Sequence, residues 1–328
     1  MIAAFKKKEP GNVALLLILS LILKLPIFLY PRALPISPGD GPLYQLITAW
    51  FNSPDEWYIF GLLSFSLLYV HALIITNLVN EHRMTTRATF LPGMAYILIT
   101  SLIPEWNYLS PALIASTFIL LSISHLFSLY NVSAGNSKIY NSGLLLGLAS
   151  YIYYPSLGFV LCVITGLLIL RAFKLNEILL FLIGILTPAY LLAVYLFLTD
   201  GFSINKIIPT VEWHIPHFKR SVWTLVTFLL IIIPFVLGGY YIQHQLGKML
   251  IQARKNWSII LLLLMLALFI PLLNNNNDLT NWILALAPFA AFHASGYLYL
   301  RKKWISTLCF LIFIAFILVQ QYASSVWN

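Results

Sequence analysis

The chain has 328 residues, of which 60% are hydrophobic and only 9% are charged. A soluble domain carries about 25% charged residues, so this composition excludes a water-soluble fold of this size. The net charge of +9 does not indicate nucleic-acid binding, because the basic residues lie at the ends of apolar stretches rather than in one cluster beside aromatic residues.

Apolar stretches follow one another along the whole chain. A helix that spans the hydrocarbon core needs about 20 mostly apolar residues. We therefore predict an all-α polytopic membrane protein in which residues 1–328 form a single membrane domain without a separate soluble part. The eleven predicted spans are 12–31, 57–79, 88–104, 111–130, 139–152, 155–171, 177–199, 221–243, 258–273, 280–300 and 304–322.

The first apolar stretch follows Lys6, Lys7 and Lys8 and is predicted to be an uncleaved span, since it is longer than the apolar region of a signal peptide. With the N-terminus placed in the cytoplasm, fourteen of the 19 Lys and Arg residues fall on the inner side and Lys24 falls within the first span. The other four, Arg32, Lys206, Lys219 and Arg220, fall outside. Because basic loops stay in the cytoplasm, this bias predicts a bacterial inner-membrane protein with a periplasmic C-terminus.

The first outer loop has a turn followed by a short helix. Ser37 to Pro42 must turn, because the segment is rich in Pro and Gly. Apolar residues then recur at helical spacing from Leu43 to Phe51, which predicts an amphipathic helix in the headgroup plane. Asp40 lies between span and helix, and two interpretations stay open: it makes a local turn, or it is a general base or metal ligand that faces a lipid-borne substrate.

Two further residues near the outer side are candidates. Glu105 lies in the second outer loop beside Trp106 and Tyr108, either in an ordinary interfacial belt or as a second acidic group that faces the cavity of Asp40. Two carboxylates in one cavity could bind a divalent cation or share acid and base roles. Lys24 is costly within a span, so it either snorkels or pairs with an ion, or it faces the bundle interior and neutralises a lipid phosphate.

The third outer loop, residues 200–220, contains His214, His217, Lys219 and Arg220. Pro216 spoils the helical spacing of the two histidines, so we predict no metal site there. The four residues form either a cationic patch for phosphate or a solvated loop. The histidines within spans, His71, His125 and His293, are predicted to make helix–helix hydrogen bonds.

Several of these segments together resemble the GT-C superfamily of membrane glycosyltransferases, which use polyprenyl-phosphate sugars. Residues 39–44, Gly-Asp-Gly-Pro-Leu-Tyr, and the helix after them are similar to the first outer loop of that family, and residues 140–149 and 153–156 are similar to its glycine-rich middle spans. The resemblance covers residues 1–200, with additional transmembrane helices in residues 201–328, and the chain also resembles inner-membrane families of Bacteroidota.

The resemblance implies a glycosyltransferase that acts on a polyprenyl-phosphate-linked glycan at the periplasmic face, with Asp40 and Glu105 as catalytic residues. Phosphate would be held by Lys24, His214, His217, Lys219 and Arg220, and a divalent cation could take part. The first outer loop has no adjacent acidic pair and no DxD follows the third span, which leaves open a scaffold subunit that binds other membrane proteins in an envelope export or assembly complex. A small-solute transporter is a third alternative, which the absence of a clear internal repeat weakens.

Overall fold

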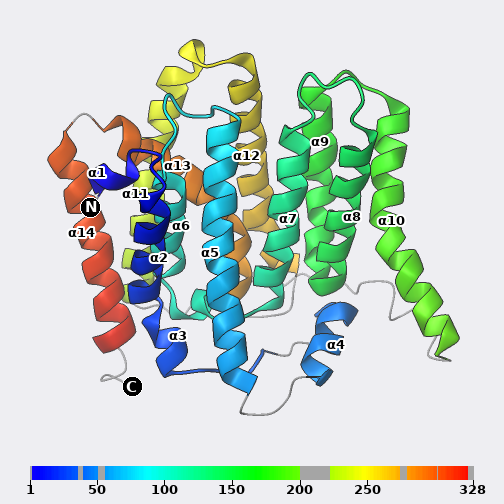
Figure 1. Ribbon diagram of the computed structural model, residues 1–328, viewed down its shortest axis with the longest axis horizontal. Coiled ribbons are helices and arrows are strands. Elements are labelled where there is room, and N and C mark those ends of the chain that lie inside the picture. Colours follow the sequence, from blue (N-terminus) through cyan, green and yellow to red (C-terminus); the bar gives the residue numbers. More distant parts are fainter. Residues whose placement is uncertain are drawn as a thin grey trace.

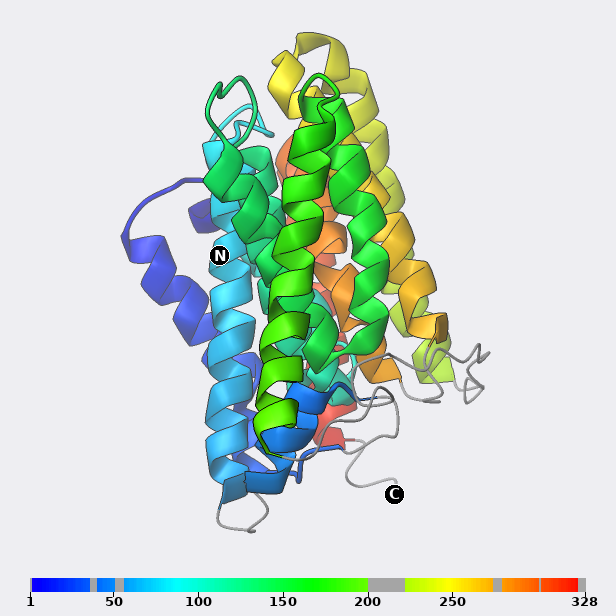
Figure 2. The same cartoon turned by 90° about the vertical axis from the view of Figure 1, so that its right-hand side faces the viewer.

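The computed structural model describes residues 2–35, 40–50, 56–199, 222–273, 279–300 and 302–323. Throughout these ranges the regular structure is helical, apart from one isolated β-bridge between Asp40 and Tyr153. The longer helices run side by side, so that the chain passes repeatedly between two ends of one bundle (Figure 1). Seen from the side, the same helices remain close to parallel, and the short helix α4 lies at one end of them (Figure 2).

The elements follow the predicted apolar segments closely. In chain order they are α1 (Ile2–Phe5), α2 (Gly11–Leu23), α3 (Leu25–Leu29), α4 (Pro42–Trp50), α5 (Trp57–Glu81), α6 (Leu91–Thr100), η2 (Pro104–Asn107), α7 (Pro111–Phe127), α8 (Asn136–Ile152), η3 (Tyr154–Phe159), α9 (Val160–Leu170), α10 (Leu175–Leu198), α11 (Val222–Gln245), η5 (Leu246–Lys248), α12 (Ile251–Phe269), η6 (Ile270–Leu273), η7 (Leu279–Ala285), α13 (Leu286–Tyr299), α14 (Lys303–Leu318) and η8 (Val319–Ala323).

Five helical stretches are long and apolar enough to cross a membrane: Trp57–Glu81, Leu175–Leu198, Val222–Lys248, Ile251–Leu273 and Trp304–Gln321. The chain is therefore an all-helical, membrane-type protein. Fewer helices than the eleven predicted spans are long and apolar enough without interruption, because several of the predicted segments are broken into shorter helices. The first segment breaks at Lys24 between α2 and α3, and α6 extends over only 10 residues before the chain turns.

The break between the fifth and sixth predicted segments is confirmed. Helix α8 ends at Ile152, Tyr153 is extended, and η3 begins at Tyr154 with Pro155 in its first turn. Within α8, Gly143 lies directly against α10, where an added Cβ would be 2.2 Å from the carbonyl oxygen of Phe181. Small residues let two helix backbones approach this closely, which explains the glycines of this segment.

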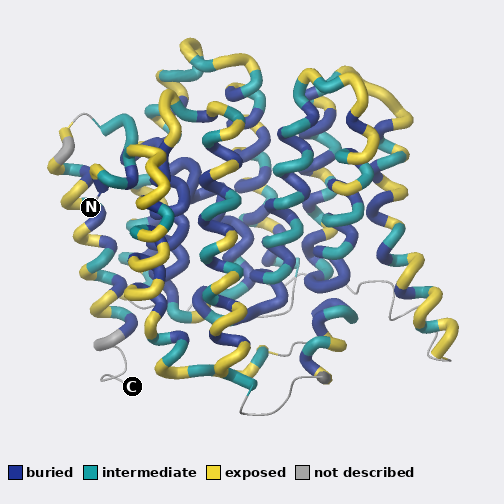
Figure 3. Tube along the Cα trace, in the orientation of Figure 1, coloured by how far each residue is buried: buried dark blue, intermediate teal, exposed yellow. Residues whose placement is uncertain are grey.

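Burial divides the bundle into an interior and a rim. Every residue of α6 is buried, and so is α13 from Leu286 to Tyr297. Helices α10 and α11 instead expose many large apolar side chains along their length, and Figure 3 shows α10 with a mostly uncovered outer side. Apolar side chains on an outer surface are what a lipid environment tolerates and water does not.

The two ends of the bundle differ in charge. We call the end that carries the connections 82–90, 128–135, 171–174 and 246–250 the basic end, and the opposite end, which carries α4, the α4 end (Figure 1). The described Lys and Arg residues at or near the basic end are Lys6, Lys7, Lys8, Arg83, Arg87, Lys138, Arg171, Lys174, Lys248, Arg254, Lys255 and Lys302. At the α4 end the described basic residues are Arg32 and the buried Lys24.

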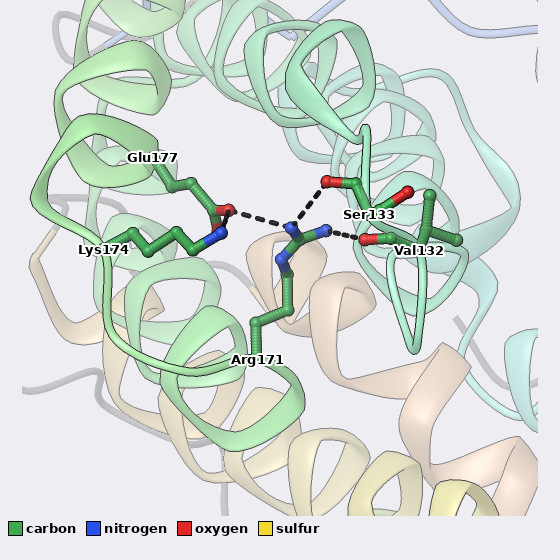
Figure 4. A network of polar contacts seen from close by, with 5 residues as sticks. All are labelled: Val132, Ser133, Arg171, Lys174 and Glu177. Carbon is green, nitrogen blue, oxygen red and sulfur yellow. Dashed lines mark hydrogen bonds and ion pairs between the residues drawn. The ribbon is translucent and has the colours of Figure 1, made fainter.

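An ion pair locks two connections together at the basic end (Figure 4). Arg171 donates from Nη2 to Glu177 Oε1 at 2.9 Å and from Nη1 to the carbonyl oxygen of Val132 at 2.7 Å. The side chains of Arg171 and Glu177 are only 10% and 11% exposed. The planar guanidinium can reach several oxygens at once, so this one residue ties the α7–α8 connection to the start of α10.

Candidate functional site

Asp40 is fixed against the corner between α8 and η3. The backbone of Asp40 pairs with that of Tyr153 in an antiparallel β-bridge. The amide of the following residue, Gly41, donates to the carbonyl oxygen of Ile152 at 3.0 Å. Asp40 is only 1% exposed and Tyr153 is fully buried. Residues 37–39 of the predicted turn lie outside the described residues, and Asp40, near its end, is fixed through its backbone to a part of the bundle that is distant in the chain.

Gly41 is required at this docking point by close approach. A Cβ atom at this position would lie 2.1 Å from the carbonyl oxygen of Tyr151, a backbone atom that cannot swing aside. The Asp-Gly pair therefore places Asp40 where any larger following residue would push the loop off α8.

The predicted short helix is present as α4, and it covers Asp40. Tyr44 and Thr48, one turn apart, are buried on its inner side, whereas Leu46 is 42% exposed. The side-chain amide of Gln45 donates to the carbonyl oxygen of Asp40 at 2.9 Å, and the Tyr44 hydroxyl donates to the carbonyl oxygen of Pro35 at 3.0 Å.

The negative charge of Asp40 also affects the pKa of Tyr44. Burial raises the pKa of the Tyr44 phenol, and the nearby negative charge of Asp40 raises this pKa further. The phenol therefore stays protonated and remains a hydrogen-bond donor beside the carboxylate.

Lys24 forms a second polar cluster at the α4 end. Its ammonium donates to Asn107 Oδ1 at 2.7 Å and to Thr100 Oγ1 at 3.0 Å, and the residue is 0% exposed. Ser64 holds this cluster from α5 by donating to the carbonyl oxygen of Asn107 at 2.6 Å. Lys24 thus neither snorkels nor pairs with a carboxylate of the described residues; it faces the bundle interior with two neutral oxygen partners.

Glu105 lies near Lys24 in the chain fold only through Asn107, which is on the same short helix η2. It is exposed on η2, two residues from the Asn107 that accepts from Lys24, and Trp106 Nε1 anchors this turn by donating to the carbonyl oxygen of Leu279 at 2.7 Å. Burial raises the pKa of neighbouring Tyr108, the Arg32 charge lowers it, and Glu105 raises it. Helix α4 packs on α8, whereas η2 packs on η7 and α5.

The remaining candidate residues fall into two groups. His214, His217, Lys219 and Arg220 lie outside the described residues. His71 makes the predicted helix–helix bonds, to the Tyr96 hydroxyl at 2.9 Å and the Thr117 hydroxyl at 2.7 Å, and His293 Nε2 lies 2.8 Å from the carbonyl oxygen of Ile231. Within the described ranges, His, Cys, Asp and Glu residues form no group of three that could hold a metal ion.

Sequence reasoning missed the residues that surround the two clusters. Thr100 and Asn107 carry no motif, and their only signal is that a lysine within an apolar segment needs polar partners from neighbouring helices. Tyr44 lies within the predicted amphipathic helix and carries no motif of its own. Its burial against α8 could not be read from a local pattern.

Comparison of the chain with models of known protein families, with curated proteins and with solved structures found no match.

Proposed function

We propose that this chain is an inner-membrane protein of eleven spans with its N-terminus and basic end in the cytoplasm. The charge difference between the two ends supports this orientation, since basic connections are retained on the cytoplasmic side. The six segments beyond the five long apolar helices would cross as interrupted or tilted helices inside the rim.

We further propose that the α4 end is a glycosyltransferase site of GT-C type, which takes a sugar from a polyprenyl phosphate at the periplasmic face. The observation that carries this proposal is the buried carboxylate of Asp40, held at a fixed position beneath a helix that exposes Leu46. A lipid-borne donor would reach such a site from the headgroup layer, and a carboxylate shielded from bulk water is a stronger base than an exposed one.

In this reaction Asp40 accepts the proton of an acceptor hydroxyl while the hydroxyl oxygen forms a bond to the anomeric carbon of the sugar. The bond between that carbon and the phosphate oxygen breaks, and the polyprenyl phosphate leaves with the electron pair. Tyr44 stays protonated near Asp40 and donates a hydrogen bond to the carbonyl oxygen of Pro35, so its role is to hold the segment that precedes Asp40.

Lys24 would contribute through its positive charge rather than by contact. The ammonium is sealed from solvent behind Asn107 and Thr100, so a phosphate touches it only if this cluster opens. A fixed cation near a developing phosphate charge lowers the energy of the transition state in a low-dielectric site.

The experiment compares the full chain with its Asp40→Asn variant. Purified protein in nanodiscs is given undecaprenyl-phosphate-linked glucose, mannose or aminoarabinose, with labelled sugar, and a crude periplasmic glycan fraction as acceptor. We expect wild-type protein to release polyprenyl phosphate and the Asp40→Asn variant to be slower by about 10²- to 10⁴-fold, the contribution of a general base.

Glu105→Gln is compared in the same assay, because Glu105 is an exposed carboxylate on η2, and a loss as large as that of Asp40→Asn would show that both carboxylates take part. Equal transfer by wild type and Asp40→Asn contradicts the catalytic role of Asp40. A stoichiometric protein partner that copurifies with the chain, together with no turnover of any donor, favours a scaffold subunit instead.

A further inference from the structure

The basic end contains a hollow that converging cations line. A cavity of about 420 Å³ lies between the α5–α6 connection and the turn that joins α11 to α12. Its lining residues are Asn80, Arg83, Thr85, Thr86, Arg87, Ala88, Lys248, Met249 and Leu250, which include three cationic side chains and no carboxylate.

The retention of basic loops in the cytoplasm does not account for this arrangement. That rule fixes the side of the membrane on which a basic residue lies, and any position in the loop satisfies it. Arg83 and Arg87 here meet Lys248, which is more than 160 residues later in the chain, around one hollow. In the described part of the chain, none of these three side chains forms an ion pair with a carboxylate.

The loop that carries the two arginines is held in place from several directions. Trp257 Nε1 donates to the carbonyl oxygen of Met84 at 2.8 Å, and the amide of Thr86 donates to the Tyr299 hydroxyl at 3.3 Å. The Asn80 side chain donates to the carbonyl oxygen of Thr89 at 2.9 Å and accepts from its amide at 3.0 Å. The hollow is therefore a built feature rather than a gap beneath a loose loop.

Arg83 itself adopts a left-handed backbone conformation, with φ 48°. This region is uncommon for a residue with a side chain, and it persists where surrounding contacts impose it. Arg83 follows the C-cap His82 of α5, and the helix end is closed by the Arg83 amide, which donates to the carbonyl oxygen of Asn80 at 3.1 Å, and by the Met84 amide, which donates to that of Val79 at 3.0 Å.

The geometry points to a binding site for a phosphate group in this cavity, with Arg83, Arg87 and Lys248 as its ligands. Arginine and lysine side chains are the usual partners of phosphate oxygens, the former through paired N–H donors and the latter as a point charge.

Leu250 lines the same cavity, and it and the neighbouring Ile251 are exposed apolar residues. Cations beside exposed apolar side chains at a helix end match an anionic lipid, whose phosphate meets the cations while its acyl chain follows the helix. This inference concerns the end opposite α4 and does not depend on the proposed transferase.

The test measures lipid retention by native mass spectrometry on the purified full chain. Phosphatidylglycerol is compared with phosphatidylcholine of the same acyl chains, and glycerol 3-phosphate and inorganic phosphate are added as soluble competitors. We expect wild-type protein to prefer phosphatidylglycerol. The triple variant Arg83→Gln, Arg87→Gln, Lys248→Gln should bind it about 100-fold more weakly, because each basic residue contributes about five-fold to binding of an anionic lipid surface.

The matched control is Lys8→Gln, Lys138→Gln, Arg254→Gln, which removes the same charge from the same end but from residues that do not line the cavity. If the triple variant fails to fold, two single variants at exposed residues repeat the comparison: Lys248→Glu changes the cavity, and Arg254→Glu is its control outside the cavity. Loss only in the cavity variants supports the site. If glycerol 3-phosphate displaces bound phosphatidylglycerol as effectively as added lipid does, the result also supports the site and identifies a soluble phosphate ester as its ligand.

Two results overturn the inference. One is equal retention of both lipids by wild-type protein together with no binding of either soluble phosphate. The other is an equal loss in the cavity variants and their controls, which would show a response to net charge alone.

Discussion

Two cations at opposite ends of the bundle, one mostly and one fully shielded from solvent, are held in different ways. Arg171, at the basic end, donates to the carboxylate of Glu177 and to the carbonyl oxygen of Val132, and it joins two connections. Lys24, at the α4 end, donates to the neutral oxygens of Thr100 and Asn107 and is completely buried.

This difference indicates that Arg171 has a structural role, whereas a contribution to stability does not explain why Lys24 is buried. A paired and multiply bonded arginine holds its neighbours in register, and its removal leaves a buried carboxylate. A lysine with neutral partners recovers only part of its desolvation cost through its hydrogen bonds, so its presence in the interior calls for another reason. Intramembrane ionisable residues of this kind are functional-site candidates by default.

The largest expected effect is at the paired cation. Glu177→Gln leaves Arg171 partly buried without its carboxylate, and we expect a loss of about 3 kcal/mol in the free energy of unfolding. The measurement is unfolding in mixed micelles titrated with SDS. Glu81→Gln, at an exposed position, is the control and should change stability by less than about 0.5 kcal/mol. Equal stability of the two variants would remove the structural role of Arg171.

An intermediate effect is expected at the support of the Lys24 cluster. Ser64→Ala removes the 2.6 Å hydrogen bond to the carbonyl oxygen of Asn107 and leaves that buried oxygen with one partner fewer. We expect a loss of about 1 kcal/mol in the same titration. Ser66→Ala, on the exposed side of α5, is the matched control, and a loss as large there would show that position on α5 alone decides the effect.

The smallest effect on stability is expected at Lys24 itself. Lys24→Met keeps the length of the side chain, relieves the cost of a buried ammonium and sacrifices two hydrogen bonds, so these contributions offset each other to within about 1 kcal/mol. Transfer activity should fall although the fold is retained. A loss of 3 kcal/mol or more would make Lys24 a structural brace like Arg171 and end the contrast between the two cations.

Local patterns predicted much of this architecture, because helix ends and breaks have local causes. The predicted bounds 139–152 and 155–171 match the interruption after α8, where η3 has Pro155 in its first turn, and the predicted helix after the Pro- and Gly-rich segment is present as α4. The predicted start of the ninth segment, residue 258, was late, since α12 begins at Ile251. Its first turns carry Gln252, Arg254 and Lys255, which lie outside an apolar window but continue the same helix.

The two clusters at the α4 end could not be predicted in the same way. Tyr153, which pairs with Asp40, and Thr100, which accepts from Lys24, are 76 or more residues away in the chain, and a single sequence contains no record of which distant segments meet. The position of Asp40 after the first apolar segment could be read from the sequence, whereas its burial against Tyr153 depends on which helices pack together, a property of the whole bundle.

The bridge between Asp40 and Tyr153 also has a consequence for how the protein is made. At the ribosome Asp40 emerges about 110 residues before Tyr153, which at 5–20 residues per second is a delay on the order of ten seconds. During that interval the segment around Asp40 lacks the partner on which it docks in the folded protein. The carboxylate is withdrawn from water only when the hairpin of α8 and α9 has been inserted, so this part of the molecule matures late in biogenesis.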